Sequence, residues 1–233
     1  MPRDRIRIDH LSIECIVGVL PEERRREQPL ALDLELRLDL SAAAHSGRIS
    51  ETCDYDRVAD EVGALLRFRR YRLLEMAAEE VAAMVLGNHP VVDQVRLSLH
   101  KPLALRGRAR SVCVEIERAP HDYPRRYEHT DFGEVEVLLE TTEAGLYLLH
   151  VEPGRQIPSH FHRVMRELEW SVVGELRRDG ARRSGLDPVV WRTGQVHAYE
   201  NVGRTRATVF CCDCPPFIRG DEVSVAGEQE TVR

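Results

Sequence analysis

The chain has 233 residues, 42% of them hydrophobic and 31% charged, which is long enough for two ordinary domains and typical of a soluble globular protein. Its formal net charge of −6, with arginines interleaved among acidic residues, gives no reason to expect a nucleic-acid partner. No apolar run approaches membrane-spanning length, and the opening sequence MPRDRIRIDH lacks the apolar core of a secretion signal. We therefore expect a cytoplasmic protein without a membrane partner.

The first half of the chain contains strand and helix patterns in the order strand, strand, helix, helix, strand, strand. Leucine occupies every even position from 30 to 40, and Asp, Glu or Arg fills positions 33, 35, 37 and 39, which predicts a strand with one wet face. Similar apolar periodicities predict strands over 4–17, 91–100 and 111–118 and helices over 55–68 and 73–86. This order favours an α+β layer, a sheet covered on one face by two helices.

Residues 119–130 separate two differently patterned halves. They contain two prolines, mixed charges and no apolar periodicity, which is typical of a linker. The sequence therefore predicts a first domain over 1–118, a linker over 119–130 and a second domain over 131–233.

The second half contains His160, His162 and Glu167, followed by His197. Residues two apart on a strand point to the same face, so His160 and His162 can look into one barrel or sandwich. Three imidazoles and a carboxylate suit one divalent transition metal, and Fe, Mn, Ni, Zn and Co all remain open.

These candidate ligands lie among regularly placed small and polar residues, Gly154, Gly174, Gly194 and Asn201. The whole pattern resembles the double motif of the cupin superfamily over roughly residues 130–220. The second motif departs from the family, because Trp191 and Arg192 stand where a proline is usual. The resemblance implies an all-β double-stranded β-helix, or jelly roll, and it leaves the substrate unspecified.

The first half resembles dihydroneopterin aldolase, of the tunnelling-fold family, over roughly residues 4–118. The residues that carry the resemblance, in order, are Gly18, Val19, Glu23, Tyr55, Leu74, Glu75, Lys101 and Pro102. The resemblance implies a ββααββ fold with an antiparallel sheet. It also implies self-association into tetrameric rings that stack as octamers, with active sites at subunit boundaries.

The resemblance assigns three catalytic residues. Lys101 is the general base, acting through an ordered water. Tyr55 reprotonates the enol intermediate, and Glu23 contacts substrate and orients the water. Glu22 is adjacent to Glu23, so the match could be displaced by one residue. Without the resemblance, each would be read as an ordinary solvated or packed side chain.

The resemblance also assigns a pterin site. Glu75 is the anchor, because a carboxylate can accept two adjacent N–H groups of the pterin in a bidentate pair. The backbone amides near Leu73 and Leu74 contact the same ring. Helical periodicity alone would make Glu75 an exposed charge on an amphipathic helix.

The implied reaction is retro-aldol cleavage of 7,8-dihydroneopterin to glycolaldehyde and 6-hydroxymethyl-7,8-dihydropterin, with side-chain epimerisation as a second activity. The pterin ring is the electron sink, so this domain needs no metal or organic cofactor. Two alternatives stay open: a pterin-binding protein without turnover, and an aldolase whose cupin domain is regulatory and non-catalytic.

The six cysteines do not form a disulfide framework. Cys15, Cys53 and Cys113 have apolar neighbours, which predicts buried, reduced thiols. Cys212 and Cys214 could bind metal or oxidise. We favour Cys211, Cys212 and Cys214 as small apolar side chains of a late barrel strand.

Overall fold

The computed structural model describes residues 4–105, 107–182 and 186–225. The chain divides into two compact units, Met1–Pro124 and Arg125–Arg233, and each is described here by itself. None of the described helices is both long and apolar enough to cross a membrane.

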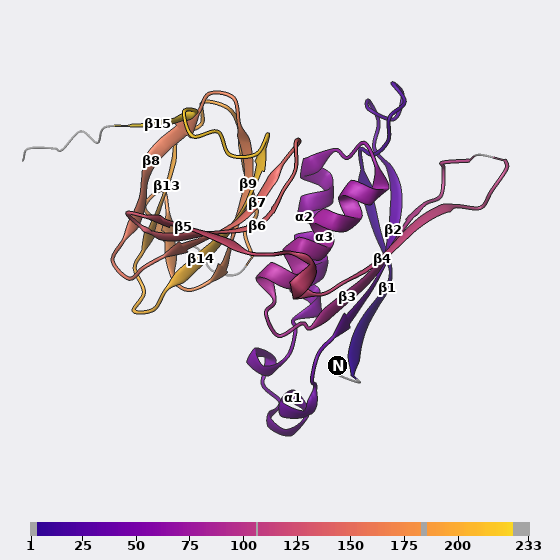
Figure 1. The fold of residues 1–233 in the computed structure, drawn as a ribbon, viewed down its shortest axis with the longest axis horizontal. Helices are drawn as coiled ribbons and strands as arrows, with labels where there is room; N and C mark the ends of the chain where they lie inside the picture. Colours follow the sequence, from indigo (N-terminus) through magenta and orange to yellow (C-terminus); the bar gives the residue numbers. More distant parts are fainter. Residues whose placement is uncertain (1–3, 106, 183–185, 226–233) are drawn as a thin grey trace, which may run out of the picture. The chain divides into compact units, whose positions relative to one another are not determined.

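The N-terminal unit is an antiparallel sheet with the strand order β1-β2-β3-β4. Two helices pack on one face of the sheet (Figure 1). The elements are β1 (Arg5–Cys15), β2 (Gln28–Arg37), α1 (Ser41–Ser46), η1 (Ile49–Glu51), α2 (Tyr55–Arg69), α3 (Leu74–Asn88), β3 (Gln94–Lys101) and β4 (Val112–Arg118). The expected ββααββ tunnelling fold is therefore confirmed.

The alternation of leucine with polar residues along β2 determines which face of the sheet is buried. Its inward leucines are at most 2% exposed, namely Leu30, Leu32, Leu34 and Leu36. Leu34 pairs with Ile8 on β1 and with Leu97 on β3, so apolar side chains line up across the strands. Helix α2 begins where the Asp54 carboxylate accepts hydrogen bonds from two backbone N–H groups of its first turn.

The other face of this sheet is polar, and the prediction made for one cysteine on it was wrong. Cys113 is exposed, whereas we expected it to be buried. It lies on β4 in phase with Glu115 and out of phase with Val112 and Val114, so strand alternation turns it toward the charged face.

The stretch predicted to be a linker is only partly irregular. A 3-10 turn, η2 (Pro120–Asp122), ends the N-terminal unit, and β5 (Arg126–Thr130) pairs with β6 in the second unit. The second half of residues 119–130 is thus an edge strand. Its own residues lack apolar alternation because four of the five are exposed.

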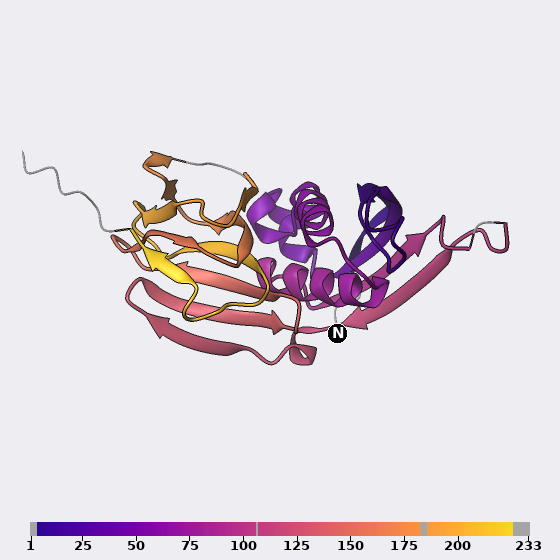
Figure 2. The ribbon, with the colours of Figure 1, turned by 90° about the horizontal axis from the view of Figure 1, so that it is seen from above.

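The C-terminal unit consists of two antiparallel sheets, seen from a second direction in Figure 2. One has the order β12-β9-β14-β7-β6-β5 and the other β11-β10-β13-β8-β15. The remaining strands are β6 (Gly133–Glu140), β7 (Gly145–Val151), β8 (Gln156–His162), β9 (Arg166–Val173), β10 (Leu176–Arg178), β11 (Ala181–Arg182), β12 (Val189–Trp191), β13 (His197–Asn201), β14 (Ala207–Cys214) and β15 (Glu222–Ser224). The expected all-β double-stranded β-helix is confirmed.

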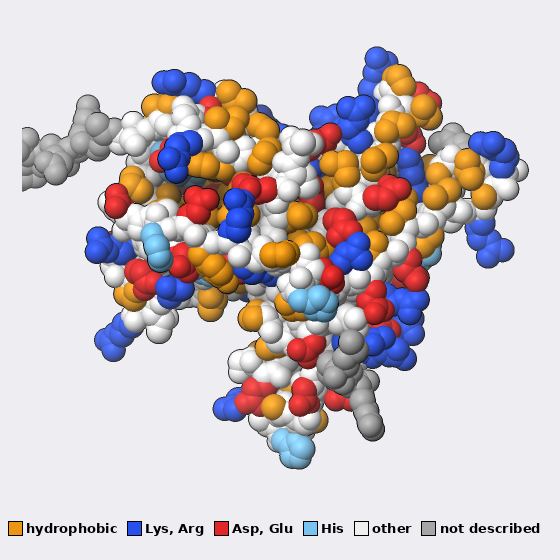
Figure 3. Space-filling model, in the orientation of Figure 1, with side chains coloured by type: hydrophobic (Ala, Val, Ile, Leu, Met, Phe, Trp, Pro, Cys, Tyr) orange, Lys and Arg blue, Asp and Glu red, His pale blue; other side chains and the backbone are white. Residues whose placement is uncertain are grey.

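Side chains from both sheets meet in an apolar core, made by Val151, Ile157, Leu176, Tyr199, Ala207 and Val209. This core fills one part of the space between the two sheets, and polar side chains line another part of that space. On the face drawn in Figure 3, basic and acidic side chains are interspersed.

Candidate functional site

Lys101 and Glu23 form a largely buried ion pair in the N-terminal unit. Lys101 ends β3 and is 7% exposed, and its Nζ lies 2.5 Å from Glu23 Oε1. Burial would raise the pKa of Glu23, but the hydrogen bonds from Lys101 and from the backbone at Leu20 outweigh it and hold that pKa below its usual value. The pair therefore places the Lys101 amine and the Glu23 carboxylate at one end of the sheet.

Gly18 makes room for this carboxylate. Its φ of +128° lies in a region that side chains rarely adopt, and a Cβ there would come within 2.2 Å of Glu23 Oε2. The same oxygen accepts a hydrogen bond from the N–H of Leu20 at 3.0 Å. The positive φ at position 18 thus favours glycine, which also leaves room for the Glu23 carboxylate.

Arg24 and Tyr71 anchor the loop that carries Glu23, and neither residue was predicted to belong to the site. Arg24 Nη1 donates to the carbonyl oxygens of Gly18 and Tyr71, and the N–H of Gly18 also donates to Tyr71. The Tyr71 hydroxyl donates to buried Glu80, which Arg69 holds through two further hydrogen bonds. A buried network between the helices therefore fixes the loop.

The other expected residues of this site are more open. Tyr55, at the start of α2, is 59% exposed, and Glu75, in the first turn of α3, is also exposed. Leu73 is 49% exposed, whereas Leu74 is buried. In the described part of the chain, neither Tyr55 nor Glu75 makes a hydrogen bond or ion pair with Lys101 or Glu23.

A compositional signal for Lys101 was missed in the sequence. Lys101 is the only lysine among the 33 Lys and Arg residues of the chain. Arginine stays protonated at any ordinary pH, whereas a lysine can give up its proton and act as a base. Lys101 is therefore the one Lys or Arg side chain of the sequence whose chemistry suits proton transfer.

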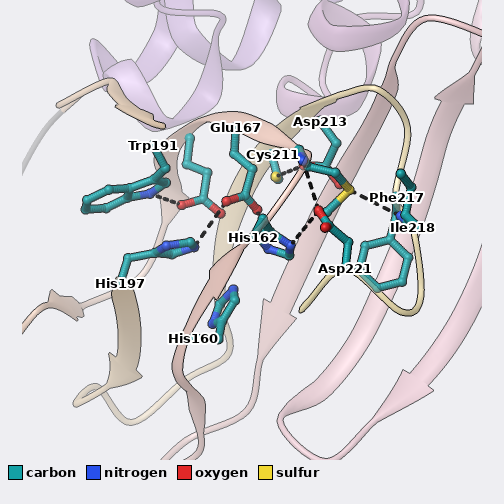
Figure 4. A network of polar contacts seen from close by, with 12 residues as sticks. His160, His162, Glu167, Trp191, His197, Cys211, Asp213, Phe217, Ile218 and Asp221 are labelled. Atoms are coloured by element: carbon teal, nitrogen blue, oxygen red, sulfur yellow. Dashed lines mark hydrogen bonds and ion pairs between the residues drawn. The ribbon is translucent and has the colours of Figure 1, made fainter. Parts of the chain in front are cut away.

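In the C-terminal unit, the four expected ligands converge. His160 and His162 lie on β8, Glu167 on β9 and His197 on β13, directly opposite His160 (Figure 4). Each is at most 5% exposed, and one ligand-type atom from each lies within 4.8 Å of all the others. Four donors from three strands are thus gathered at one point.

Backbone carbonyl groups orient two of the histidines so that the other ring nitrogen of each is available to a metal. His160 Nδ1 lies 2.7 Å from the carbonyl oxygen of Pro158, and His197 Nδ1 lies 3.3 Å from that of Gln195. A carbonyl only accepts, so each Nδ1 carries the proton and each Nε2 keeps its lone pair. Burial lowers the pKa of His197 to about 4, which keeps this imidazole neutral.

A buried nitrogen among the four expected ligands lacks a hydrogen-bond partner. His197 Nε2 is buried and has no hydrogen-bond partner, although it lies 3.4 Å from Glu167 Oε2. A buried lone pair without a partner is costly, and a cation would satisfy it. The donor set therefore fits a divalent transition metal.

Asp221 holds the segment between the ligands. Its carboxylate accepts hydrogen bonds from the N–H groups of Arg163, Val164 and Met165, at 2.9–3.1 Å. Its Oδ2 also lies 3.7 Å from His162 Nδ1. Asp221 lies far from the motif in sequence, so only the fold reveals its role.

Trp191, which departs from the family pattern, packs against a ligand. Its ring stacks on His197 with centroids 4.7 Å apart, and its Nε1 donates to Glu169 at 2.5 Å. Tyr199 donates to the same carboxylate oxygen at 2.7 Å. Burial raises the pKa of Glu169. The aromatic ring thus fixes the orientation of His197.

A cavity of about 180 Å³ opens beside the ligands, with His160, His162 and Glu167 in its wall. Cys211 and Asp213 on β14 also line it, and Asp213 pairs in register with Glu167. Cys211 Sγ lies 2.9 Å from Asp213 Oδ1.

The three clustered cysteines lie on a buried barrel strand, as expected, and none forms a disulfide. Among them, Cys211 lines the cavity. Cys212 and Cys214, which we considered as a metal-binding pair, are out of phase with Cys211 on the strand.

Two solved structures illustrate what each half is similar to. Escherichia coli dihydroneopterin aldolase in complex with neopterin is 35% identical and covers 50% of this chain and 99% of its own, with a TM-score of 0.48. An uncharacterized Klebsiella pneumoniae protein with a double-stranded β-helix domain is 20% identical and covers 47% of this chain and 96% of its own, with a TM-score of 0.35.

Sequence comparisons identify the first half. The family model FolB, dihydroneopterin aldolase, matches residues 6–117. Dihydroneopterin aldolase of Escherichia coli K12 is 37% identical over 117 residues, which are 49% of this chain and 93% of that protein. The enzyme of Methylorubrum extorquens is 35% identical over 101 residues, 43% of this chain and 78% of that protein. Through its N-terminal half, the chain belongs to the dihydroneopterin aldolase family.

Proposed function

We propose that the N-terminal unit is a carbon–carbon lyase that cleaves 7,8-dihydroneopterin to glycolaldehyde and 6-hydroxymethyl-7,8-dihydropterin. The observation that carries this proposal is the partly buried pair of Lys101 and Glu23, in which the only lysine of the chain contacts a carboxylate held by a fixed loop. Membership of the family supplies the substrate.

In this mechanism Lys101 is the general base and acts through a water that Glu23 orients. The base takes the proton of the side-chain hydroxyl next to the ring-bound carbinol. The carbon–carbon bond then breaks, and glycolaldehyde leaves. The electron pair of the broken bond passes into the pterin ring. Tyr55 returns a proton to the resulting enol. If the aldehyde instead adds back from its other face, the product is an epimer.

The pterin would lie against the start of α3. Glu75 is exposed there and free to accept two N–H groups of the ring in a bidentate pair, a strong and directional contact. The backbone amides near Leu73 and Leu74 lie in the same first turn, where helix N–H groups lack partners within the helix.

We also propose that this site is completed by a second copy of the chain, in a tetramer or octamer. Tyr55 is 59% exposed, and among the described residues it forms no hydrogen bond with Lys101 or Glu23, which supports this arrangement. An isologous or ring-forming contact would bring Tyr55 of one subunit to Lys101 of another.

A second function is favoured by the unsatisfied Nε2 of His197. We propose that His160, His162, Glu167 and His197 bind one divalent transition metal, with Fe, Mn, Ni, Zn and Co as candidates. When bound, such an ion supplies Lewis acidity or an activated water. Whether this domain turns over a substrate or regulates the aldolase is decided by the variants described in the Discussion.

The aldolase proposal is tested by product analysis. Purified protein is incubated with 7,8-dihydroneopterin, and glycolaldehyde and 6-hydroxymethyl-7,8-dihydropterin are quantified by chromatography. Both products should form in equal amounts. Tight pterin binding without either product would contradict turnover and favour a pterin-binding protein.

A further inference from the structure

The wall of the C-terminal cavity is rich in carboxyl groups. Six carboxylates line it, from Glu128, Glu140, Glu167, Glu169, Asp213 and Glu222. Among the described residues that line the cavity there is neither lysine nor arginine. A ligand that carried a phosphate or carboxylate would find no basic side chain in the wall to pair with.

Some of these carboxylates already have partners. Glu140 accepts from Tyr147 and pairs with Arg126, whose side chain is 60% exposed. Glu169 accepts from Trp191 and Tyr199. These two acids are therefore largely compensated before any ligand enters.

Two others lie at the opening of the cavity. Glu128 and Glu222 are both exposed and both line the cavity, so they lie where it opens to solvent. In the described part of the chain, neither side chain makes a hydrogen bond or an ion pair. Their charges act on every molecule that enters, including one that would bind a metal at the histidines.

The rest of the wall is apolar or can form uncharged hydrogen bonds. The apolar part consists of Phe132, Val135, Val137, Leu149, Ile157 and Phe217. The hydroxyl of Thr130 lines the cavity too, and its oxygen is buried without a hydrogen-bond partner. The carboxylates add acceptors, so the wall offers apolar contact and acceptors to the donors of a ligand.

We propose that this cavity takes an uncharged or cationic small molecule that presents O–H or N–H donors, and that it rejects anions such as carboxylates and phosphates. The proposal rests on the metal centre proposed above and names its ligand class. Rejection follows from the unfavourable charge of Glu128 and Glu222 at the opening, which an anion must pass to reach the histidines.

The test compares two small probes on the cobalt-loaded full-length protein. Imidazole, mostly neutral at about pH 8, and azide, an anion, are titrated while the visible cobalt spectrum is recorded at low salt. The proteins are the wild type, the double variant Glu128→Gln/Glu222→Gln, and the control Glu143→Gln/Glu175→Gln. The control removes two exposed carboxylates that do not line the cavity.

We expect the Glu128→Gln/Glu222→Gln variant to bind azide about three- to tenfold more tightly than the wild type, and imidazole within about twofold. The gain should shrink as salt is added, and the control should match the wild type. Equal azide affinity in all three proteins, or no imidazole binding by the wild type, would overturn the proposal. Bound cobalt is measured first, and failure to take it up would overturn the metal centre itself.

Discussion

The two units assemble their candidate sites in different ways. In the C-terminal unit, four ligands from three strands are each at most 5% exposed and have ligand atoms within 4.8 Å of one another. In the N-terminal unit, Lys101 and Glu23 meet, but Tyr55 and Glu75 stay exposed. A buried site can be complete in one chain, whereas the open arrangement agrees with the proposal that a second copy completes the N-terminal site.

The largest expected effect is a loss of aldolase activity, without loss of folding, in a variant of the N-terminal unit. Lys101→Arg keeps a positive charge beside Glu23 but cannot give up a proton, so aldolase activity should fall about a hundredfold to ten-thousandfold. Circular dichroism and the melting temperature should stay close to wild type. An active Lys101→Arg enzyme would remove lysine from the role of base.

The second expected effect concerns the buried cluster of four candidate metal ligands in the C-terminal unit. His160→Ala/His162→Ala removes two of the four ligands, and affinity for a divalent metal should drop at least about a hundredfold. Metal content after dialysis and titration calorimetry measure this. His129→Ala, whose side chain is 91% exposed, is the control and should bind like wild type.

The same double variant distinguishes the possible roles of the C-terminal domain. If aldolase kinetics change while no separate reaction disappears, the domain is regulatory. Loss of a distinct metal-dependent conversion with unchanged aldolase kinetics would establish a second enzyme activity. Retention of stoichiometric metal would contradict the ligand assignment.

A third experiment tests the carboxylate and its alignment. Glu23→Gln removes the charge that pairs with Lys101, and kcat should fall by about ten- to a hundredfold. The neighbouring Glu22 is exposed, so Glu22→Gln should behave as wild type. If Glu22→Gln were the impaired variant, the match to the family would be displaced by one residue.

Subunit mixing tests the dependence on a second copy. Tyr55→Phe and Lys101→Arg should each be inactive alone. Unfolded together and refolded as a mixture, they should recover about a quarter of wild-type activity, because one site in four would combine intact residues from two chains. Light scattering reports the oligomer. If each site lay within one chain, the mixture would stay inactive.

The smallest effect is on stability. His89 Nε2 lies 2.8 Å from buried Glu61. Burial alone would lower the pKa of His89, but its contacts with Cys53 and Glu61 outweigh it and raise that pKa to about 9. Because the folded value lies above the ordinary 6.5, the stabilisation is complete below about pH 6.5 and is lost as the pH rises through about 9.

Calorimetry at these two pH values should show the N-terminal unit unfolding at lower temperature in alkali, with at most about 3 kcal/mol at stake. His89→Gln should flatten this dependence between the two pH values. His121→Gln, a change at a side chain that is 82% exposed, should leave it as in wild type. A wild-type profile that is equally flat would contradict the contribution of His89.

Local periodicity was enough to predict the strands and the two long helices of the N-terminal unit, and the ligands close together in sequence. The leucines of β2 alternate and are buried, and His160 and His162 share a face because they are two apart on one strand. Their convergence with His197 required the motif, since only the pairing of β8 with β13 brings the two strands together.

The rest depends on contacts between distant segments. Asp221 caps a loop that lies 56–58 residues away in sequence, and Arg24 holds Tyr71 from 47 residues away. Residues 126–130 have no alternation of their own and become a strand because β6 offers its edge. Cys113 was misjudged because its apolar neighbours point to the opposite face.

The central claim is that one chain holds a pterin aldolase whose chemistry is independent of the metal centre. The most direct measurement is cleavage of 7,8-dihydroneopterin by protein stripped with a chelator, with metal content determined on the same sample. We predict equal rates of glycolaldehyde formation in stripped and metal-loaded protein. Cleavage that disappears with the metal and returns when it is restored, or no cleavage in either sample, would contradict the account.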